Sequence, residues 1–116
     1  MARILIVEDE QDIVDLLRFN LRQAGHDPEV ATTGEEALSQ IARTRPDLVL
    51  LDLMLPDLPG TEICRRIKGD ARTKHVPVIM VTARGEEVDR LVGFELGADD
   101  FVTKPFSARA AAARAR

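Results

Sequence analysis

Short apolar runs alternate along the chain with longer stretches in which apolar residues recur every three or four positions. The runs cover residues 4–7, 48–51 and 78–81. Continuous apolar runs are typical of buried parallel strands, and the periodic stretches between them are typical of amphipathic crossover helices. With a last short strand near Phe101 and Val102, the pattern predicts an α/β sandwich of five strands and five helices.

The first predicted helix lies between the first two apolar runs. Its apolar stripe is formed by Ile13, Leu16, Leu17, Leu21 and Ala24. Gly25 follows this stripe, and glycine commonly ends a helix because it adopts left-handed backbone angles at no steric cost. An amphipathic helix that ends at Gly25 is therefore expected.

The second predicted helix has a signal at each end. Thr33 is followed three residues later by Glu36, which is the spacing of a capping box. Pro46 is expected to end the helix. The stripe that this helix should bury consists of Ala37, Leu38, Ile41 and Ala42.

Three further helices are expected in the second half of the chain. The third is predicted from Ile63, Cys64 and Ile67, and the fourth from a stripe made of Val88, Leu91, Val92 and Leu96, with Gly97 after it. Alanine content favours a last helix over residues 107–116. Because alanines leave little apolar area to dock, this Ala/Arg-rich helix is expected to fray beside a core of residues 1–106.

The composition argues against several classes of protein. The chain has 116 residues, of which 45% are hydrophobic and 31% are charged, so one folded domain is expected rather than a disordered chain. Its formal net charge of −4 argues against general nucleic-acid binding. No apolar run approaches the roughly 20 residues of a membrane span, so a cytoplasmic location is the default. The single cysteine, Cys64, is expected to pack on a helix.

Polar side chains stand at the end of four predicted strands. Glu8 and Asp9 follow the first apolar run, and Asp52, Thr82 and Lys104 stand at the ends of the later ones. Carboxyl ends of parallel strands lie at the same edge of a sheet, where ligands bind at the point of strand-order reversal. These five side chains are therefore expected to converge on one pocket.

The predicted pocket combines three carboxylates, a hydroxyl and an ammonium group. Crowded carboxylates need positive charge, which Lys104 and a hard divalent cation would supply. Oxygen ligands favour Mg²⁺, with Mn²⁺ as the substitute. Asp52, which follows the most apolar strand, is the expected nucleophile toward phosphorus, and Thr82 and Lys104 would donate to the phosphoryl oxygens.

Four motifs at these positions resemble the response-regulator receiver family of two-component signalling, up to about Phe106. They are Val-Glu-Asp-Glu at 7–10, Leu-Asp-Leu-Met-Leu-Pro at 51–56, Val-Thr-Ala-Arg at 81–84 and Thr-Lys-Pro-Phe at 103–106. The stretches around 82–87 and 97–106 look like the OmpR/PhoB branch. The resemblance implies a flavodoxin-like (CheY-like) fold, with a five-stranded parallel sheet between five helices.

The resemblance also implies roles for single residues. Asp9, Asp52 and the backbone carbonyl of Met54 would hold the metal, with Glu8 helping through water. Asp52 would be phosphorylated by a sensor histidine kinase, so the chain is expected to be a regulatory phosphoacceptor and not an enzyme acting on a separate substrate. Thr82 and Phe101 would be the switch residues, and they would change the face made by the fourth helix, the fifth strand and the fifth helix.

In the OmpR/PhoB branch that face forms a symmetric dimer and the output is transcriptional. The corresponding residues here are Arg90, Leu91, Phe94, Asp100 and Arg114. Asp100 and Arg114 match one charge pair, whereas Arg90 would face Ala110, where an acidic residue is usual. The family's DNA-binding domain has no counterpart after Arg116, so this chain alone is not expected to bind DNA.

Two other functions remain open at this point. An aspartate-based phosphohydrolase would need an acid two residues after the nucleophile, where Met54 stands, and a substrate cap for which the chain is short. A receiver-like interaction module that never takes phosphate is disfavoured by the intact Glu8, Asp9, Asp52, Thr82 and Lys104. Dinucleotide binding is disfavoured because no Gly-x-Gly-x-x-Gly motif follows the first strand.

Overall fold

The computed structural model describes residues 2–52, 55–83 and 100–104. The strands of this part of the chain are β1 (Arg3–Val7), β2 (Asp27–Ala31), β3 (Leu48–Asp52), β4 (Val78–Ala83) and β5 (Asp100–Lys104). Its helices are α1 (Gln11–Gln23), α2 (Gly34–Thr44) and α3 (Gly60–Gly69). The predicted fourth and fifth helices lie outside the described residues.

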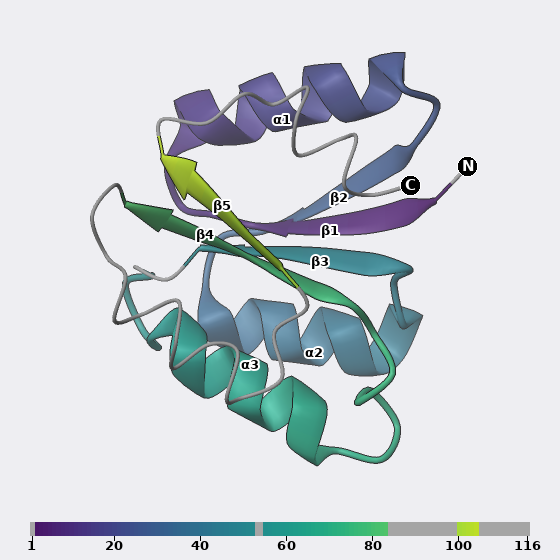
Figure 1. The fold of residues 1–116 in the computed structure, drawn as a ribbon, viewed down its shortest axis with the longest axis vertical. Coiled ribbons are helices and arrows are strands. Elements are labelled where there is room, and N and C mark those ends of the chain that lie inside the picture. Colours follow the sequence, from purple (N-terminus) through teal and green to yellow (C-terminus); the bar gives the residue numbers. More distant parts are fainter. Residues whose placement is uncertain (1, 53–54, 84–99, 105–116) are drawn as a thin grey trace.

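The five strands form one parallel sheet in the order β2-β1-β3-β4-β5 (Figure 1). All five residues of β3 are buried, as expected for the strand at the centre of the sheet. The strand order reverses between β1 and β3, which are hydrogen-bonded neighbours. The predicted five-stranded parallel sheet is therefore confirmed, and the reversal point lies beside the strand that ends in Asp52.

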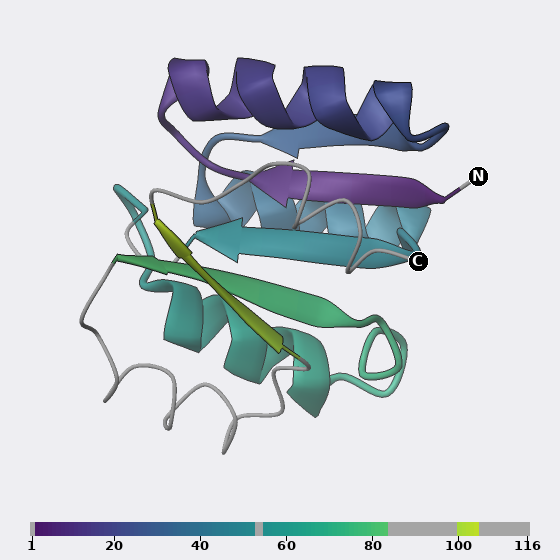
Figure 2. The same cartoon turned by 45° about the horizontal axis from the view of Figure 1, so that its top comes forward.

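The described helices cover both faces of this sheet. Helix α1 lies on one face, and α2 and α3 lie side by side on the other (Figures 1 and 2). Alternate residues of β1 accordingly enter two separate apolar clusters. Ile4 and Ile6 pack with Leu17 of α1, whereas Leu5 and Val7 pack in the cluster that contains residues of α2 and α3. This arrangement is a three-layer sandwich.

The predicted helix ends agree with the structure at three positions. Gly25 has a φ of +86°, which is the left-handed conformation expected of a residue that ends a helix. The Thr33 hydroxyl accepts a hydrogen bond from the Glu36 backbone N–H at 3.2 Å. Helix α2 ends at Thr44, and Arg45 turns out of it with a φ of 45° directly before Pro46.

Two details of the predicted apolar stripes are wrong. Leu16 is 49% exposed, and Val14, which the stripe omitted, is 1% exposed. The buried arc of α1 therefore runs through Val14, Leu17 and Leu21, with Ile13 and Ala24 at its margin. In α2, Ala42 is exposed, although Ala37 and Ile41 are buried.

The third stripe is confirmed, because Ile63, Cys64 and Ile67 are all buried in α3. Cys64 is completely buried, in agreement with a packing role. No apolar run in the sequence marks the position of strand β2. It lies at an edge of the sheet and contains Pro28 and Glu29, residue types that edge strands tolerate. Among the described residues, no helix has the length and apolar character to cross a membrane.

Candidate metal centre

Three carboxylates meet where β1 and β3 end. Glu8 and Asp9 directly follow β1, and Asp52 is the last residue of β3. The two strands pair in parallel with Val7 opposite Leu51, so Glu8 and Asp52 are the next residues at this edge. The edge is the point of strand-order reversal, where open parallel sheets bind ligands.

The spacing of these carboxylates suits a bound cation. One oxygen from each of Glu8, Asp9 and Asp52 lies within 4.8 Å of the others. Glu8 and Asp52 are only 2% and 3% exposed, whereas Asp9 is exposed. The Glu10 backbone N–H donates to Glu8 Oε2 at 3.2 Å and so fixes that side chain. Oxygen donors of this kind fit a hard divalent cation such as Mg²⁺ or Mn²⁺.

The strand register places the other predicted site residues along the same edge. Val81 is paired with Asp52, and Thr82 is the next residue of β4. Lys104 ends β5 opposite Ala83. Thr82 and Lys104 therefore lie at the carboxyl ends of their strands, as the sequence predicted. The contacts of their side chains with Asp52 stay predictions.

The remaining predicted residues divide into two groups. Phe101 and Asp100 belong to β5, opposite Met80 and Ile79, so their backbone positions are known. The others lie outside the described residues, and the roles expected of them stay predictions. They are Met54, Arg90, Leu91, Phe94 and Arg114.

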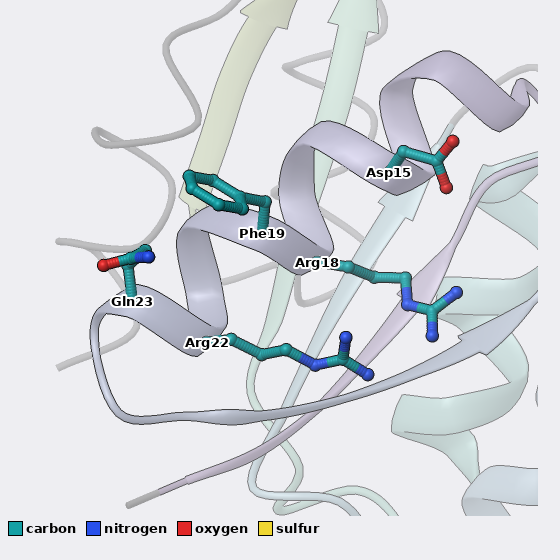
Figure 3. Close-up of a pocket in the computed structure, with 5 residues that line it drawn as sticks. All are labelled: Asp15, Arg18, Phe19, Arg22 and Gln23. Atoms are coloured by element: carbon teal, nitrogen blue, oxygen red, sulfur yellow. The ribbon is translucent and has the colours of Figure 1, made fainter.

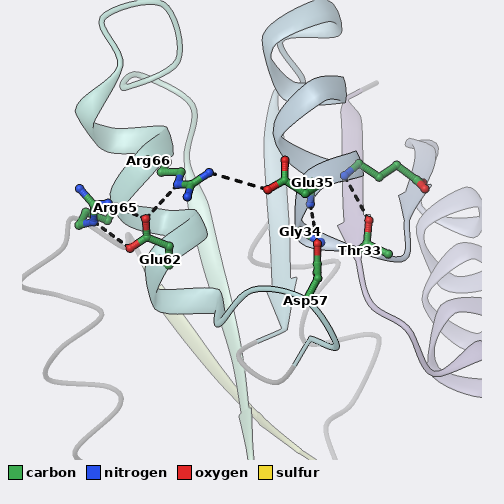
Figure 4. A network of polar contacts seen from close by, with 8 residues as sticks. Thr33, Gly34, Glu35, Asp57, Glu62, Arg65 and Arg66 are labelled. Atoms are coloured by element: carbon green, nitrogen blue, oxygen red, sulfur yellow. Dashed lines mark hydrogen bonds and ion pairs between the residues drawn. The ribbon is translucent and has the colours of Figure 1, made fainter.

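Asp57 is a residue that the sequence did not single out. It lies in the loop from 55 to 59 that follows β3, and it accepts hydrogen bonds from the backbone N–H groups of Gly34 at 2.7 Å and Glu35 at 3.0 Å (Figure 4). These two donors hold the pKa of the exposed Asp57 carboxyl below its ordinary value. Asp57 thus caps α2 from a loop 23 residues away, a spacing that no local capping pattern reveals.

A match along nearly the whole sequence decides which protein family the chain belongs to. Residues 4–116 match the family described as the response regulator receiver domain. The chain belongs to this family. The receiver domain predicted from the four motifs is therefore confirmed, and the flavodoxin-like fold agrees with the observed strand order.

Curated relatives of this receiver domain are about twice as long as the chain. The sensory transduction protein RegX3 of Mycobacterium tuberculosis is 53% identical over 116 residues, which are 100% of this chain and 50% of the relative. The alkaline phosphatase synthesis transcriptional regulatory protein PhoP of Bacillus subtilis is 46% identical over 114 residues, which are 98% of this chain and 47% of the relative. The chain thus spans about half the length of these relatives, which support the predicted OmpR/PhoB-like branch.

Solved structures show the same fold. A putative response regulator from Chloroflexus aurantiacus has a TM-score of 0.93 and 37% identity, over 97% of this chain and 93% of that chain. The chemotaxis response regulator CheY4 of Vibrio cholerae has a TM-score of 0.91 and 27% identity, over 100% of this chain and 99% of that chain. The receiver fold is therefore shared across regulators with quite different sequences.

The receiver domain also has a shallow hollow on the surface of α1, far in sequence from Asp52. Among the described residues, those that line it belong to this helix and are Asp15, Arg18, Phe19, Arg22 and Gln23 (Figure 3). Arg18 and Arg22 extend in the same direction, and Phe19 is 62% exposed. None of these residues belongs to the carboxylate cluster, so the hollow is separate from the candidate metal centre.

Proposed function

We propose that this receiver domain is a phosphoacceptor switch in which Asp52 takes a phosphoryl group while a divalent cation is bound beside it. The observation that carries the proposal is the placement of the Glu8, Asp9 and Asp52 oxygens within 4.8 Å of one another at the strand-order reversal. The buried carboxylates of Glu8 and Asp52 cost free energy unless positive charge offsets them, so their presence beside Asp9 favours a site built for a charged ligand.

The metal would be held by the carboxylates of Asp9 and Asp52 and by the backbone carbonyl of Met54, with Glu8 acting through water. When bound, Mg²⁺ or Mn²⁺ neutralises negative charge on the oxygens of the transferred group. Glu8 supports this assignment because it is buried and its Oε2 is fixed by the Glu10 N–H. Mg²⁺ keeps several waters in protein sites, which suits a ligand set with few protein oxygens.

The transfer needs only groups that the proposed site contains. A carboxylate oxygen of Asp52 attacks phosphorus, an O–P bond forms, and the bond from phosphorus to the donor atom breaks in line with it. Lys104 would donate to one phosphoryl oxygen and Thr82 to another, so both act as charge-stabilising donors. Asp52 is well placed to be the fixed nucleophile because it ends the central strand, paired with Val81.

The donor and the output are assigned from the family. A sensor histidine kinase would supply the phosphoryl group from a phosphohistidine, and movement of Thr82 and Phe101 would then shift the population of two packings. The changed face would contain Arg90, Leu91, Phe94, Asp100 and Arg114 and would control dimerisation and a transcriptional output. RegX3 and PhoP are a sensory transduction protein and a transcriptional regulatory protein, which supports this output for a chain that spans half of their length.

Incubation with acetyl phosphate and Mg²⁺, followed by intact-mass measurement, tests the proposal. The parent protein should gain one phosphoryl group, and Asp52→Asn should gain none. Asp12→Asn is the matched control, because it removes an exposed acid from the first turn of α1 and should leave uptake unchanged. An adduct that persists in Asp52→Asn would reassign the nucleophile, and no adduct in the parent would favour an interaction module that never takes phosphate.

A further inference from the structure

The 55–59 loop is attached to the N-terminus of α2 by one side chain, that of Asp57. Both oxygens of Asp57 are used, Oδ1 by the Gly34 N–H at 2.7 Å and Oδ2 by the Glu35 N–H at 3.0 Å (Figure 4). Gly34 and Glu35 are the first two residues of α2, whose early N–H groups have no partner within the helix. The positive end of the helix dipole also favours a carboxylate at this place.

The two segments are in direct contact as well as hydrogen-bonded. A Cβ atom placed on Gly34 would lie 2.9 Å from both Ile63 Cδ1 and Leu58 Cβ. Leu58 belongs to the same loop as Asp57, so the backbone of Gly34 comes as close to this loop as a residue without a side chain permits. The loop therefore has one defined position on α2, set by packing and by the two hydrogen bonds.

This attachment bears on the candidate metal centre because of the short chain between Asp52 and Asp57. Asp52 is held from one side by its pairing in the sheet with Val81. Five residues later, Asp57 is held by α2. A loop held in one position has fewer backbone conformations, so less conformational entropy is lost when a ligand binds beside it.

We propose that Asp57 is a positioning residue that favours cation binding and phosphoryl uptake at Asp52 by holding the 55–59 loop on α2. The inference rests on the proposed function, in which Asp52 and the carbonyl at position 54 bind the metal. Asp57 itself touches neither metal nor phosphoryl group. Its effect comes from the position in which it holds the 55–59 loop on α2.

A simpler role for Asp57 is that of a helix cap, which would stabilise α2 and do nothing else. The chain offers a direct comparison, because Thr33 caps the same helix through the Glu36 N–H at 3.2 Å. Thr33 precedes α2 in the chain, so its removal weakens the helix end without releasing the 55–59 loop. Loss of Asp57 weakens the same helix end and also removes the two hydrogen bonds that hold that loop on α2.

The test compares four variants in the full chain: Asp57→Ala, Asp57→Asn, Thr33→Ala and Glu35→Gln. Calorimetric titration gives the Mg²⁺ dissociation constant, thermal unfolding gives Tm, and intact-mass time courses with acetyl phosphate give the rate of uptake. Glu35→Gln controls for charge, because it removes an exposed carboxylate from the same helix turn and keeps both backbone hydrogen bonds to Asp57.

Asp57→Ala should weaken Mg²⁺ binding by about tenfold, in the range found for residues that orient metal ligands, and should slow uptake. Asp57→Asn keeps one acceptor oxygen, so its Mg²⁺ dissociation constant should lie between those of Asp57→Ala and the parent. This variant carries the test if the alanine variant fails to fold. Thr33→Ala should lower Tm. Both Thr33→Ala and Glu35→Gln should keep the Mg²⁺ dissociation constant within about twofold of the value for the parent. Exchange of the Gly34 and Glu35 amide protons should accelerate in both Asp57 variants.

Unchanged Mg²⁺ affinity in Asp57→Ala would overturn the inference, and so would an equal loss in Thr33→Ala or Glu35→Gln. These outcomes leave the proposed function standing, since the parent still binds Mg²⁺ and takes up the phosphoryl group. Failure of the parent in both measurements is a different result. It would overturn the proposed function and this inference with it.

Discussion

Glu8 and Asp52 bring two almost completely buried carboxylates together at the ends of neighbouring strands. They are 2% and 3% exposed, and their oxygens lie within 4.8 Å of each other. At an effective dielectric constant of about 20, two like charges roughly 5 Å apart repel by about 3 kcal/mol. When both carboxylates are ionised, they repel each other at the place where a cation is proposed to bind.

Asp52→Asn should stabilise the metal-free protein. The substitution keeps the shape of the side chain and removes one of the two buried charges, so the repulsion with Glu8 is lost. We expect the free energy of unfolding in EDTA to rise by about 1 to 3 kcal/mol, the upper value being the Coulomb estimate above. Urea unfolding at neutral pH measures it. An equal or lower stability would mean that the partners of Asp52 outweigh the repulsion.

Mg²⁺ should raise the stability of the parent protein and have little effect on Asp52→Asn. A ligand that binds only the folded state adds about 1.4 kcal/mol for each tenfold excess over its dissociation constant. Tm measured across a Mg²⁺ series should therefore climb steadily in the parent. NaCl of equal ionic strength, free of divalent cations, is the control, and a similar rise with NaCl would attribute the effect to screening instead of site binding.

Gly34→Ala should destabilise the protein by about 1–3 kcal/mol, the usual cost of overpacking a filled site. The new Cβ would lie 2.9 Å from Leu58 Cβ and from Ile63 Cδ1, and the Leu58 atom is close to the backbone and cannot move away cheaply. Gly69→Ala is the matched control, because nothing lies within 4 Å of a Cβ there. That variant should be neutral or up to about 1 kcal/mol more stable. Chemical denaturation of the three proteins gives the comparison.

Leu17→Ala and Leu16→Ala should differ strongly although the residues are adjacent. Leu17 is 2% exposed in the core beneath α1, whereas Leu16 is 49% exposed. Truncation of a buried leucine costs about 2–5 kcal/mol, and an exposed substitution usually stays within about 0.5 kcal/mol. Urea unfolding of both variants checks the orientation of α1. Similar losses would mean that a further segment covers Leu16.

The sequence was sufficient for the buried strands and for the carboxylate cluster because both depend on short-range signals. Buried parallel strands are continuous apolar runs, and polar residues directly after them must lie at one edge. Orientation within a helix is less well determined, because Ile13, Leu16 and Leu17 form as good a stripe on paper as Val14, Leu17 and Leu21. Only packing against Ile4 and Ile6 decides which arc of α1 is buried.

The position of edge strand β2 and the Asp57 interaction could not be predicted from the sequence, for different reasons. Strand β2 faces solvent along one side and so needs no apolar run. Asp57 lies 23 residues from the Gly34 N–H that it accepts from, so the pair exists only after α2 and the loop have packed. Long-range contacts of this kind depend on tertiary structure, whereas the Thr33 cap three residues before Glu36 is local and was predicted.

The free energy of unfolding should differ between the parent and Glu62→Gln by an amount that depends on pH. Hydrogen bonds from Arg65 and Arg66 lower the pKa of the Glu62 carboxyl from 4.5 to about 2 (Figure 4). A carboxyl whose pKa is lowered by folding contributes stability above its unfolded pKa, and loses it as pH falls through the folded pKa. The parent should therefore be more stable than Glu62→Gln at pH 7, with a gap that closes between pH 4.5 and about 2.

The size of that gap should be small, because Arg65 and Arg66 are exposed and surface ion pairs are screened by water and salt. Urea unfolding of the parent and Glu62→Gln at a series of pH values measures it. The control is the same pair of proteins carrying Arg65→Ala and Arg66→Ala, in which Glu62 has lost both partners and the gap should no longer change between pH 4.5 and about 2. A pH-dependent gap that survives in that background would assign it to another partner of Glu62, and a flat difference in the parent pair would contradict the lowered pKa.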